Sequence, residues 1–308
     1  MGSGRWSDSD WKGYAKASSY TSKSTAEIFN TSGMAKELNP EGVKVRESRD
    51  SKDNPNSTAL IVGLDVTGSM SCVLDAMARK GLNTLATEVY DRKPISDPHI
   101  MCMGIGDAEA GDRAPLQVTQ FEADLRIAKQ LEKIYLEQGG GGNCYESYAL
   151  AWYFAARHTS IDCFEKRGHK GYLFTIGDEE PTPYLRVEDI ERVFGYKPQA
   201  DVQMDQLLTE ASRQWEIFHV IVEEGNHCRS APDKVFGKWS AALGQRALHL
   251  ADHTKLAEVI VSAIQINEGV DSDKVMKSWD GTTAIVVGKA TKALSKKAAA
   301  SSSGLVTL

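Results

Sequence analysis

The chain has 308 residues, of which 41% are hydrophobic and 25% are charged, so it has an ordinary globular balance and can bury a core without disulfide bonds. Its length suits one α/β domain with terminal extensions. A formal net charge of −6 argues against a general binder of nucleic acids or membrane surfaces.

The charge is distributed unevenly along the chain. Residues 1–57 carry a net charge of +1 and residues 269–308 a net charge of +3, which leaves about −10 for the stretch between them. An acidic central domain is better suited to a cation site than to a phosphate site.

The five cysteines are odd in number and include no Cys-x-x-Cys pair, which is typical of reduced thiols in a cytosolic protein. Residues 1–10 are polar and lack the apolar segment of a signal peptide. The sequence contains no run of 18 apolar residues that could span a membrane. We therefore expect a cytoplasmic protein.

Residues 1–57 are polar and are expected to form an irregular N-terminal arm. The arm has too many aromatic residues for a linker, and these should dock on the main domain or on a partner: Trp6, Trp11, Tyr14 and Tyr20. From residue 58 the pattern becomes regular. Short apolar runs predict strands over residues 58–64, 99–106, 116–121, 171–177, 215–222 and 246–250.

Helical spacing between these runs predicts helices over residues 73–90, 124–138, 145–158, 187–194, 205–213 and 254–265. Residues 224–242 have weak periodicity and are expected to form an irregular insertion, and residues 269–308 a C-terminal tail with a Lys/Ala/Ser-rich end. Strands that alternate with helices imply a doubly wound α/β domain, with a mainly parallel sheet covered by helices on both faces.

The most informative segment lies where the first strand ends. Residues 65–69 read Asp-Val-Thr-Gly-Ser, so Asp65, Thr67 and Ser69 bring three hard oxygen groups into one turn. Open α/β sheets bind ligands at this carboxyl edge. Free backbone N–H groups at the start of the following helix can orient the aspartate.

This loop resembles the metal-ion-dependent adhesion site of the von Willebrand factor A (vWA) family, whose pattern is Asp-x-Ser-x-Ser. Thr67 replaces the first serine and keeps the hydroxyl, as in a variant that looks typical of bacterial and phage members. The resemblance covers residues 58–268. It implies a six-stranded sheet of order 3-2-1-4-5-6, in which strand 3 is antiparallel, and a bound Mg²⁺.

A second element of the family is an aspartate at the end of a later strand. Asp178 follows the strand over residues 171–177, although Glu179 replaces the usual glycine. The resemblance implies that Asp178 acts on magnesium through water. We expect four acidic residues to cluster at the carboxyl edge and to repel an acidic partner unless a cation is bound: Asp65, Asp178, Glu179 and Glu180.

A third element of the family is a glycine-rich loop with a threonine ligand. Residues 139–142 are all glycine, but no threonine follows them. The sulfur of Cys144 is a poor magnesium ligand, so Asn143 is the candidate there and Glu146 the alternative. The predicted metal ligands are therefore Asp65, Thr67, Ser69, Asn143 and Asp178.

Other interpretations of the same residues are weaker. The loop could be an ordinary strand-to-helix turn that is capped by Ser69. A haloacid-dehalogenase-type phosphatase needs a second aspartate where Thr67 stands, and nucleotide-binding glycine patterns are absent after the first strand. Asp107 and Glu109 are expected to be solvated loop charges. The histidines lack metal-ligand spacing, and no nucleophile–base pair is found, so we expect no enzymatic activity.

The resemblance implies a magnesium-dependent protein-interaction module, in which the ion binds an exposed Asp or Glu of a partner. Cytosolic members often act beside AAA+ ATPases of the MoxR kind, which makes such an ATPase the partner suggested by analogy. The alternative is a structural or nucleic-acid-associated protein that uses the domain as a scaffold. Its contact groups would be the aromatic arm and four lysines of the tail, Lys289, Lys292, Lys296 and Lys297.

Overall fold

A computed structural model describes residues 4–20, 22–137 and 143–294. Its centre is a six-stranded sheet of order β12-β11-β7-β2-β3-β4. The strands are β2 (Thr58–Asp65), β3 (Pro98–Ile105), β4 (Leu116–Val118), β7 (Gly171–Gly177), β11 (Trp215–Val222) and β12 (Ala247–Leu250). All neighbours pair in parallel except β4, which pairs antiparallel with β3. The predicted six-stranded, mainly parallel sheet is confirmed.

The central strands are buried along their whole length, because apolar side chains project from both faces of the sheet and pack against helices. In β2, Leu60 and Val62 belong to one apolar cluster, whereas Ala59 and Ile61 belong to the other. This alternation follows from the two-residue repeat of a strand. It explains why the run over residues 58–64 is apolar at every position except Thr58 and Gly63.

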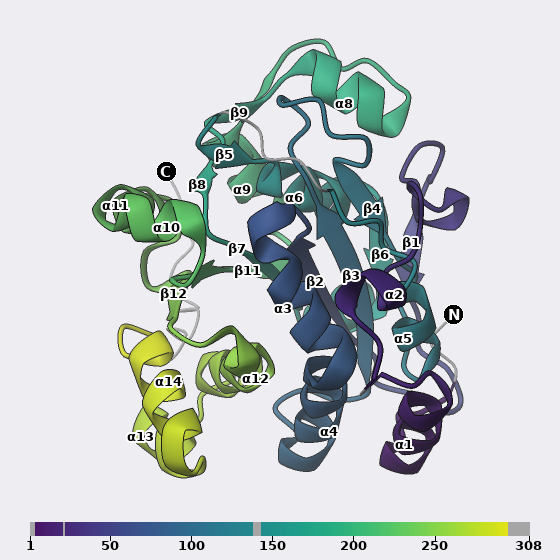
Figure 1. Cartoon of the computed structure of the whole chain (residues 1–308), viewed down its shortest axis with the longest axis vertical. Helices are drawn as coiled ribbons and strands as arrows, with labels where there is room; N and C mark the ends of the chain where they lie inside the picture. Colours follow the sequence, from purple (N-terminus) through teal and green to yellow (C-terminus); the bar gives the residue numbers. More distant parts are fainter. Residues whose placement is uncertain (1–3, 21, 138–142, 295–308) are drawn as a thin grey trace, which may run out of the picture.

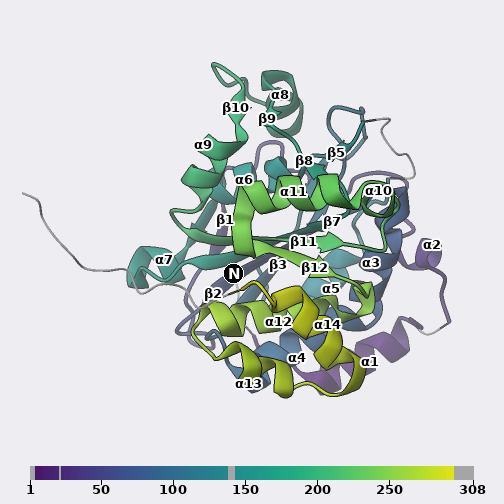
Figure 2. The ribbon, with the colours of Figure 1, turned by 90° about the vertical axis from the view of Figure 1, so that its left-hand side faces the viewer.

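Helices form a layer on each face of the sheet, and Figure 2 shows the sheet between them. One apolar cluster takes in α3 (Ser71–Ala76), α4 (Leu82–Arg92), α5 (Arg126–Leu131), α12 (Leu256–Asn267) and α14 (Gly281–Thr291). The other takes in α6 (Tyr148–Arg157), α7 (Asp162–Arg167), α8 (Val187–Phe194), α9 (Met204–Ala211) and α11 (Pro232–Leu243). A π-helical turn over Met77–Gly81 joins α3 to α4. The domain is therefore doubly wound.

The N-terminal extension was predicted to be irregular, and this prediction is wrong. The extension contains α1 (Asp8–Ala17), α2 (Thr25–Ile28) and β1 (Arg46–Ser48). Trp6, Trp11 and Tyr20 are buried in the same apolar cluster as α4 and α12. The Trp6 indole donates to Asn83 Oδ1 over 3.1 Å, and Figure 1 shows α1 beside α4. The aromatic side chains thus give α1 an apolar face, and their expected docking on the main domain is confirmed.

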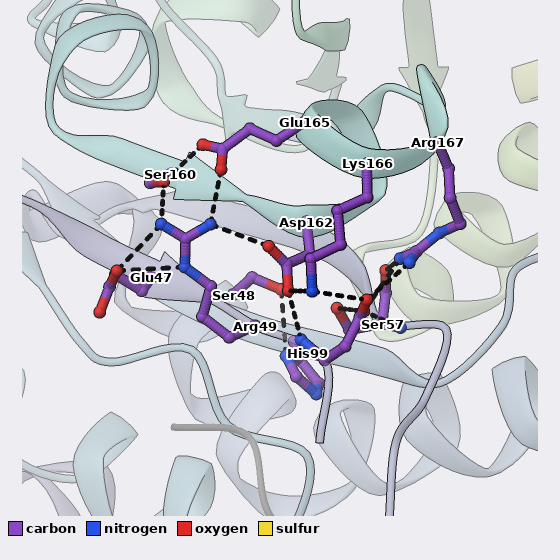
Figure 3. A network of polar contacts seen from close by, with 11 residues as sticks. Glu47, Ser48, Arg49, Ser57, His99, Ser160, Asp162, Glu165, Lys166 and Arg167 are labelled. Atoms are coloured by element: carbon purple, nitrogen blue, oxygen red, sulfur yellow. Dashed lines mark hydrogen bonds and ion pairs between the residues drawn. The ribbon is translucent and has the colours of Figure 1, made fainter. Parts of the chain in front are cut away.

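Ion pairs fasten the end of this extension to the domain (Figure 3). β1 pairs in parallel with β6 (Thr159–Ile161). Arg49 donates to Asp162 Oδ1 over 2.8 Å, and Arg167 donates to Asp50 Oδ2 over 2.8 Å. We call this group the arginine network, and it comprises Glu47, Arg49, Asp50, Ser57, Ser160, Asp162, Glu165, Lys166 and Arg167.

Two other segments predicted as irregular are helical. Residues 224–242 contain α10 (Asn226–Ser230) and most of α11, in which Val235 and Trp239 lie four residues apart and are both buried. Residues 269–294 contain α13 (Ser272–Lys277) and α14, whose Val287 is buried. In both segments a few apolar residues at helical spacing pack on the domain, which weak overall periodicity concealed.

The helix predicted over residues 124–138 is shorter than expected, because α5 ends at Leu131. The Gln117 side chain of β4 accepts from the backbone N–H of Tyr135 and donates to its carbonyl, each over 2.8 Å. These two hydrogen bonds mimic strand pairing and hold the chain out of the helix. Residue 138 lies outside the described residues.

Short elements complete the fold. β5 (Tyr145–Glu146) pairs in parallel with β8 (Glu180–Pro181), and β9 (Tyr184–Leu185) pairs antiparallel with β10 (Val202–Gln203). Turns of 3-10 helix occur at Lys36–Leu38, Gly68–Met70, Gly244–Arg246 and His253–Lys255. Within the described ranges, no helix combines the length and the apolar character needed to cross a membrane.

Candidate functional site

The loop after β2 closes around the side chain of Asp65. Its Oδ1 accepts hydrogen bonds from the backbone N–H of Thr67 over 2.9 Å and from the Thr67 hydroxyl over 2.6 Å. Both residues are buried, and Thr67 caps the 3-10 turn that leads into α3. The predicted loop therefore forms where it was expected, with the aspartate oriented by its neighbour.

Tyr148, the first residue of α6, reaches the same aspartate from the other layer. Its hydroxyl donates to Asp65 Oδ2 over 3.2 Å and accepts from the backbone N–H of Glu179 over 3.4 Å. The ring lies against Gly177, where a Cβ atom would collide with the hydroxyl. Glycine at the end of β7 is therefore required for Tyr148 to join the ends of β2 and β7.

Asp178 follows β7 directly and is also buried. Its Oδ2 accepts from the backbone N–H of His227 over 2.8 Å, at the start of α10. Gly225 makes room for this carboxylate, because a Cβ atom there would overlap it. Asp178 Oδ1 is buried and has no hydrogen-bond partner within the described part of the chain, so one oxygen remains available to a ligand.

Three more carboxyl groups lie beside these two. Asp107, which follows β3, was expected to be a solvated loop charge, but it is buried. Its segment folds back so that the Asp107 N–H donates to Asp112 Oδ2 over 2.7 Å. Glu109 is exposed, as expected. Glu146 is buried in β5, and Glu179 is half-buried. We call Asp65, Asp107, Glu146, Asp178 and Glu179 the acidic edge.

Burial and mutual repulsion raise the pKa values of the acidic edge. Burial, with the charges of Asp65 and Glu179, raises the pKa of Glu146 to about 12. For Asp65, burial outweighs the hydrogen bonds from Thr67 and raises the pKa to about 7, with a contribution from Asp178. Burial and the charge of Asp65 raise the pKa of Glu179 to about 8. The protein interior therefore opposes the simultaneous ionisation of these groups.

The donor set of the acidic edge fits a hard divalent cation. It offers oxygen atoms only, which Mg²⁺ and Ca²⁺ prefer. Four of its buried oxygens lack a hydrogen-bond partner among the described residues, namely Asp107 Oδ2, Glu146 Oε2, Asp178 Oδ1 and Glu179 Oε2. A buried polar atom without a partner costs about 1–3 kcal/mol, and a bound cation would remove that cost.

The sequence-predicted ligands come together only in part. Asp65, Thr67 and Asp178 share the site described above. The side chain of Ser69 lies outside what the structure describes, as do residues 138–142. Asn143 is half-buried, and we observe no hydrogen bond from it to the described atoms of the acidic edge. Glu180, which was expected to join this cluster, forms ion pairs with Lys234 and Lys238 of α11.

Compact groups of three potential metal ligands occur elsewhere in the described ranges. Cys144, Glu180 and His227 form one group, and Glu224, Asp252 and His253 form another. The sequence did not reveal either group. The carboxyl groups of the acidic edge are less compact than either of these groups. The ligand set that the vWA resemblance implies also includes hydroxyl oxygens and an aspartate that acts through water.

Comparisons with known proteins leave the family open. No family model matches the chain, and no curated protein matches it. Among solved structures, it is similar to the pilus adhesin SpaC from Lactobacillus rhamnosus GG in an open conformation, with 9% identity and a TM-score of 0.47 over 72% of this chain and 31% of the adhesin. Another crystal structure of that adhesin gives the same identity and TM-score over 72% and 32%. The chain thus spans about a third of the adhesin, and this likeness identifies neither a family nor a function.

Proposed function

We propose that this protein is a non-enzymatic, magnesium-dependent protein-interaction module of the vWA kind, and that the acidic edge is its metal site. Asp65 and Thr67 would hold the ion together with Ser69, the third member of the loop pattern. Asp178 would act through water, and Asn143, in the segment before α6, would contribute its amide oxygen. When bound, the ion would supply positive charge and a coordination position for an Asp or Glu of a partner.

The observation that carries this proposal is the set of buried carboxylate oxygens without partners. A protein that used these groups only for stability would leave few of their buried oxygens without a partner. Thr67, Tyr148 and the backbone N–H of His227 hold Asp65 and Asp178 in place, but Asp178 Oδ1 and one oxygen each of the other three carboxyl groups have no partner among the described residues. The remaining oxygens are left for a ligand of positive charge.

The strand order also supports the vWA resemblance. When the six strands are numbered in chain order, the sheet reads 3-2-1-4-5-6, and its third strand, β4, is the antiparallel one. Asp65 is then the last residue of β2, and Asp178 follows the neighbouring strand β7. By analogy with the family, we propose an AAA+ ATPase of the MoxR kind as the partner. A cytoplasmic setting is supported by the five cysteines, which are all free.

The scaffold or nucleic-acid alternative loses one of its supports. Trp6, Trp11 and Tyr20 are buried against the domain, so they are not available to stack on bases. Lys289 pairs with Glu223, whereas Lys296 and Lys297 lie outside the described residues. The observations therefore favour the metal-dependent module.

Calorimetry on the full, chelator-treated chain tests the metal site. Wild type should bind Mg²⁺, and Asp65→Ala should not. Glu210→Ala is the matched control, because Glu210 of α9 pairs with Arg157 of α6 and lies outside the acidic edge. Equal magnesium affinity in wild type and Asp65→Ala would contradict the proposal. Partner capture in magnesium, in chelator and with Asp65→Ala then tests the interaction, which should require both the ion and Asp65.

A further inference from the structure

A second group of ligand atoms lies next to the acidic edge, on the side of α10 and α11. It comprises Cys144, Glu180 and His227, whose sulfur, carboxylate oxygen and imidazole nitrogen all lie within 4.8 Å of one another. These residues are separated by 36 and 47 positions in the chain. The histidines lack metal-ligand spacing along the chain, so spacing in the sequence does not reveal this group.

The backbone holds these three residues in place without a ligand. The N–H of Glu180 donates to the carbonyl of Cys144 over 3.1 Å, beside the pairing of β5 with β8. His227 is fixed at the start of α10 by its N–H, which donates to Asp178. The three side chains therefore converge from backbone that is already ordered, as a metal site requires.

The side chains of this group are sheltered from water. Glu180 is 0% exposed. His227 Nε2 is buried and makes no hydrogen bond in the described structure, although it lies 3.4 Å from Glu180 Oε1. Cys144 is half-buried and is not in a disulfide. A buried imidazole nitrogen that faces a carboxylate and a thiol without a hydrogen bond points to a shared ligand.

We propose that Cys144, Glu180 and His227 bind a divalent cation of the zinc class. Sulfur, imidazole nitrogen and carboxylate oxygen are the three donor types that zinc takes in proteins. Magnesium prefers oxygen ligands alone, so this site differs in chemistry from the acidic edge and does not rest on the function proposed for it. Three protein ligands leave a fourth tetrahedral position for water or another group.

Two lysines compete with such a cation for Glu180. Lys234 Nζ lies 2.9 Å from Glu180 Oε1, and Lys238 contacts the other oxygen and the Tyr145 hydroxyl. The lysine side chains are 55% and 39% exposed, so they can return to water at little cost. In the absence of the cation they neutralise the carboxylate, and a bound cation displaces them.

Cobalt(II) is a suitable probe, because its bond to a thiolate gives a charge-transfer absorption in the near ultraviolet. The reduced, chelator-treated full chain should show this band, and zinc should abolish it by displacing the cobalt. Cys144→Ser should lose the band, and His227→Gln should bind cobalt at least about tenfold more weakly. Cys72→Ser, which removes an exposed thiol outside the group, should keep the band.

The competing lysines distinguish a metal ligand from a residue that serves only a structural ion pair. Lys234→Gln should raise zinc affinity about two- to fivefold, because one competitor for Glu180 is gone. Asp65→Ala should keep the cobalt band even though it loses magnesium, so the two metal proposals can fail separately. The zinc proposal is overturned if wild type shows no saturable cobalt binding, if Cys144→Ser keeps the band, or if Lys234→Gln leaves zinc affinity unchanged or lower.

Discussion

The acidic edge and the arginine network use the same carboxyl chemistry in opposite ways. In the arginine network, burial alone would raise the pKa of Asp50, but hydrogen bonds from Arg167, Ser57 and Lys166 outweigh it and hold the pKa below its usual value. In the acidic edge, burial and like charges raise the pKa of Asp65 and Glu146. A cluster whose charges are already paired serves the fold, whereas one whose charges are unpaired is prepared for a ligand.

The largest expected contrast comes from removing one aspartate from each region. Asp65→Ala should lower magnesium affinity at least about a hundredfold, because it removes a proposed ligand, yet leave the free energy of unfolding of the metal-free protein nearly unchanged or higher. Asp162→Ala should destabilise the fold and leave magnesium affinity unchanged. Calorimetry and urea unfolding of both variants measure the two effects. If each variant lost both properties, the two regions would not be independent.

Within the arginine network, Arg49 is the cation whose loss should most affect stability. It donates to Asp162, whose side chain is 3% exposed, and also contacts Glu47 and Glu165. Arg49→Ala should lower the free energy of unfolding by about 2 kcal/mol, less than for a fully isolated pair because Lys166 still neutralises Asp162. Lys133→Ala removes an exposed pair with Glu37 and should cost less than about 0.5 kcal/mol. Equal losses in urea unfolding would contradict the assignment.

Magnesium binding should weaken in acid. The raised pKa values of Asp65, about 7, and Glu179, about 8, mean that both groups are partly protonated near pH 7. Binding to ionised carboxylates then releases protons, so affinity should fall by up to about tenfold per pH unit for each proton as the pH drops from 8 to 6. Calorimetry in buffers of different ionisation enthalpy counts the protons. Affinity that did not depend on pH would show that these carboxyl groups do not meet the ion.

Stability of the arginine network should also fall in acid, but in a lower pH window. The folded-state pKa of Asp50 is depressed, so its contribution is present above the unfolded value near 3.8 and is lost as the pH falls through the folded value. Between pH 5 and pH 3, wild type should lose about 1 kcal/mol more than Asp50→Asn. Urea unfolding at several pH values measures this difference, and parallel curves for the two proteins would contradict it.

The smallest expected effect is that of Glu146→Gln on stability. The raised pKa of Glu146, about 12, keeps the group protonated at neutral pH, and glutamine has nearly the same shape. The metal-free variant should therefore unfold within about 0.5 kcal/mol of wild type. Glu165→Gln in the arginine network should cost more, because Glu165 is ionised and bonded to Arg49 and Ser160. A larger loss for Glu146→Gln would break the comparison.

The strands and the loop at Asp65 could be predicted because their causes are local. Apolar residues fill both faces of β2, β7 and β11, and an aspartate followed by hydroxyls marks the turn after β2. Asp178 could be placed for the same reason, since it follows a buried strand that pairs with β2. Parallel strands bring such residues to one edge whatever the rest of the chain does.

The remaining features depend on contacts between distant segments. Trp11 gives α1 its apolar face only because α4 is there to pack on, and Gln117 ends α5 from a neighbouring strand. Asp107 looks like a surface charge until its loop folds back toward Glu146. The meeting of Cys144 with His227 likewise depends on where α10 starts. None of these has a periodic signal in the sequence.

The way the N-terminal extension is fastened has a consequence for synthesis on the ribosome. Arg46 of β1 pairs with Thr159 of β6, and Asp50 forms its ion pair with Arg167. More than a hundred residues must therefore be translated before the first fifty can be locked in place, and contacts of such long range slow folding. Until α4 has also been translated, Trp6, Trp11 and Tyr20 are exposed on the nascent chain. We expect chaperones to engage this segment before the domain closes on it, and we expect it to be the last part of the domain to gain protection from hydrogen exchange.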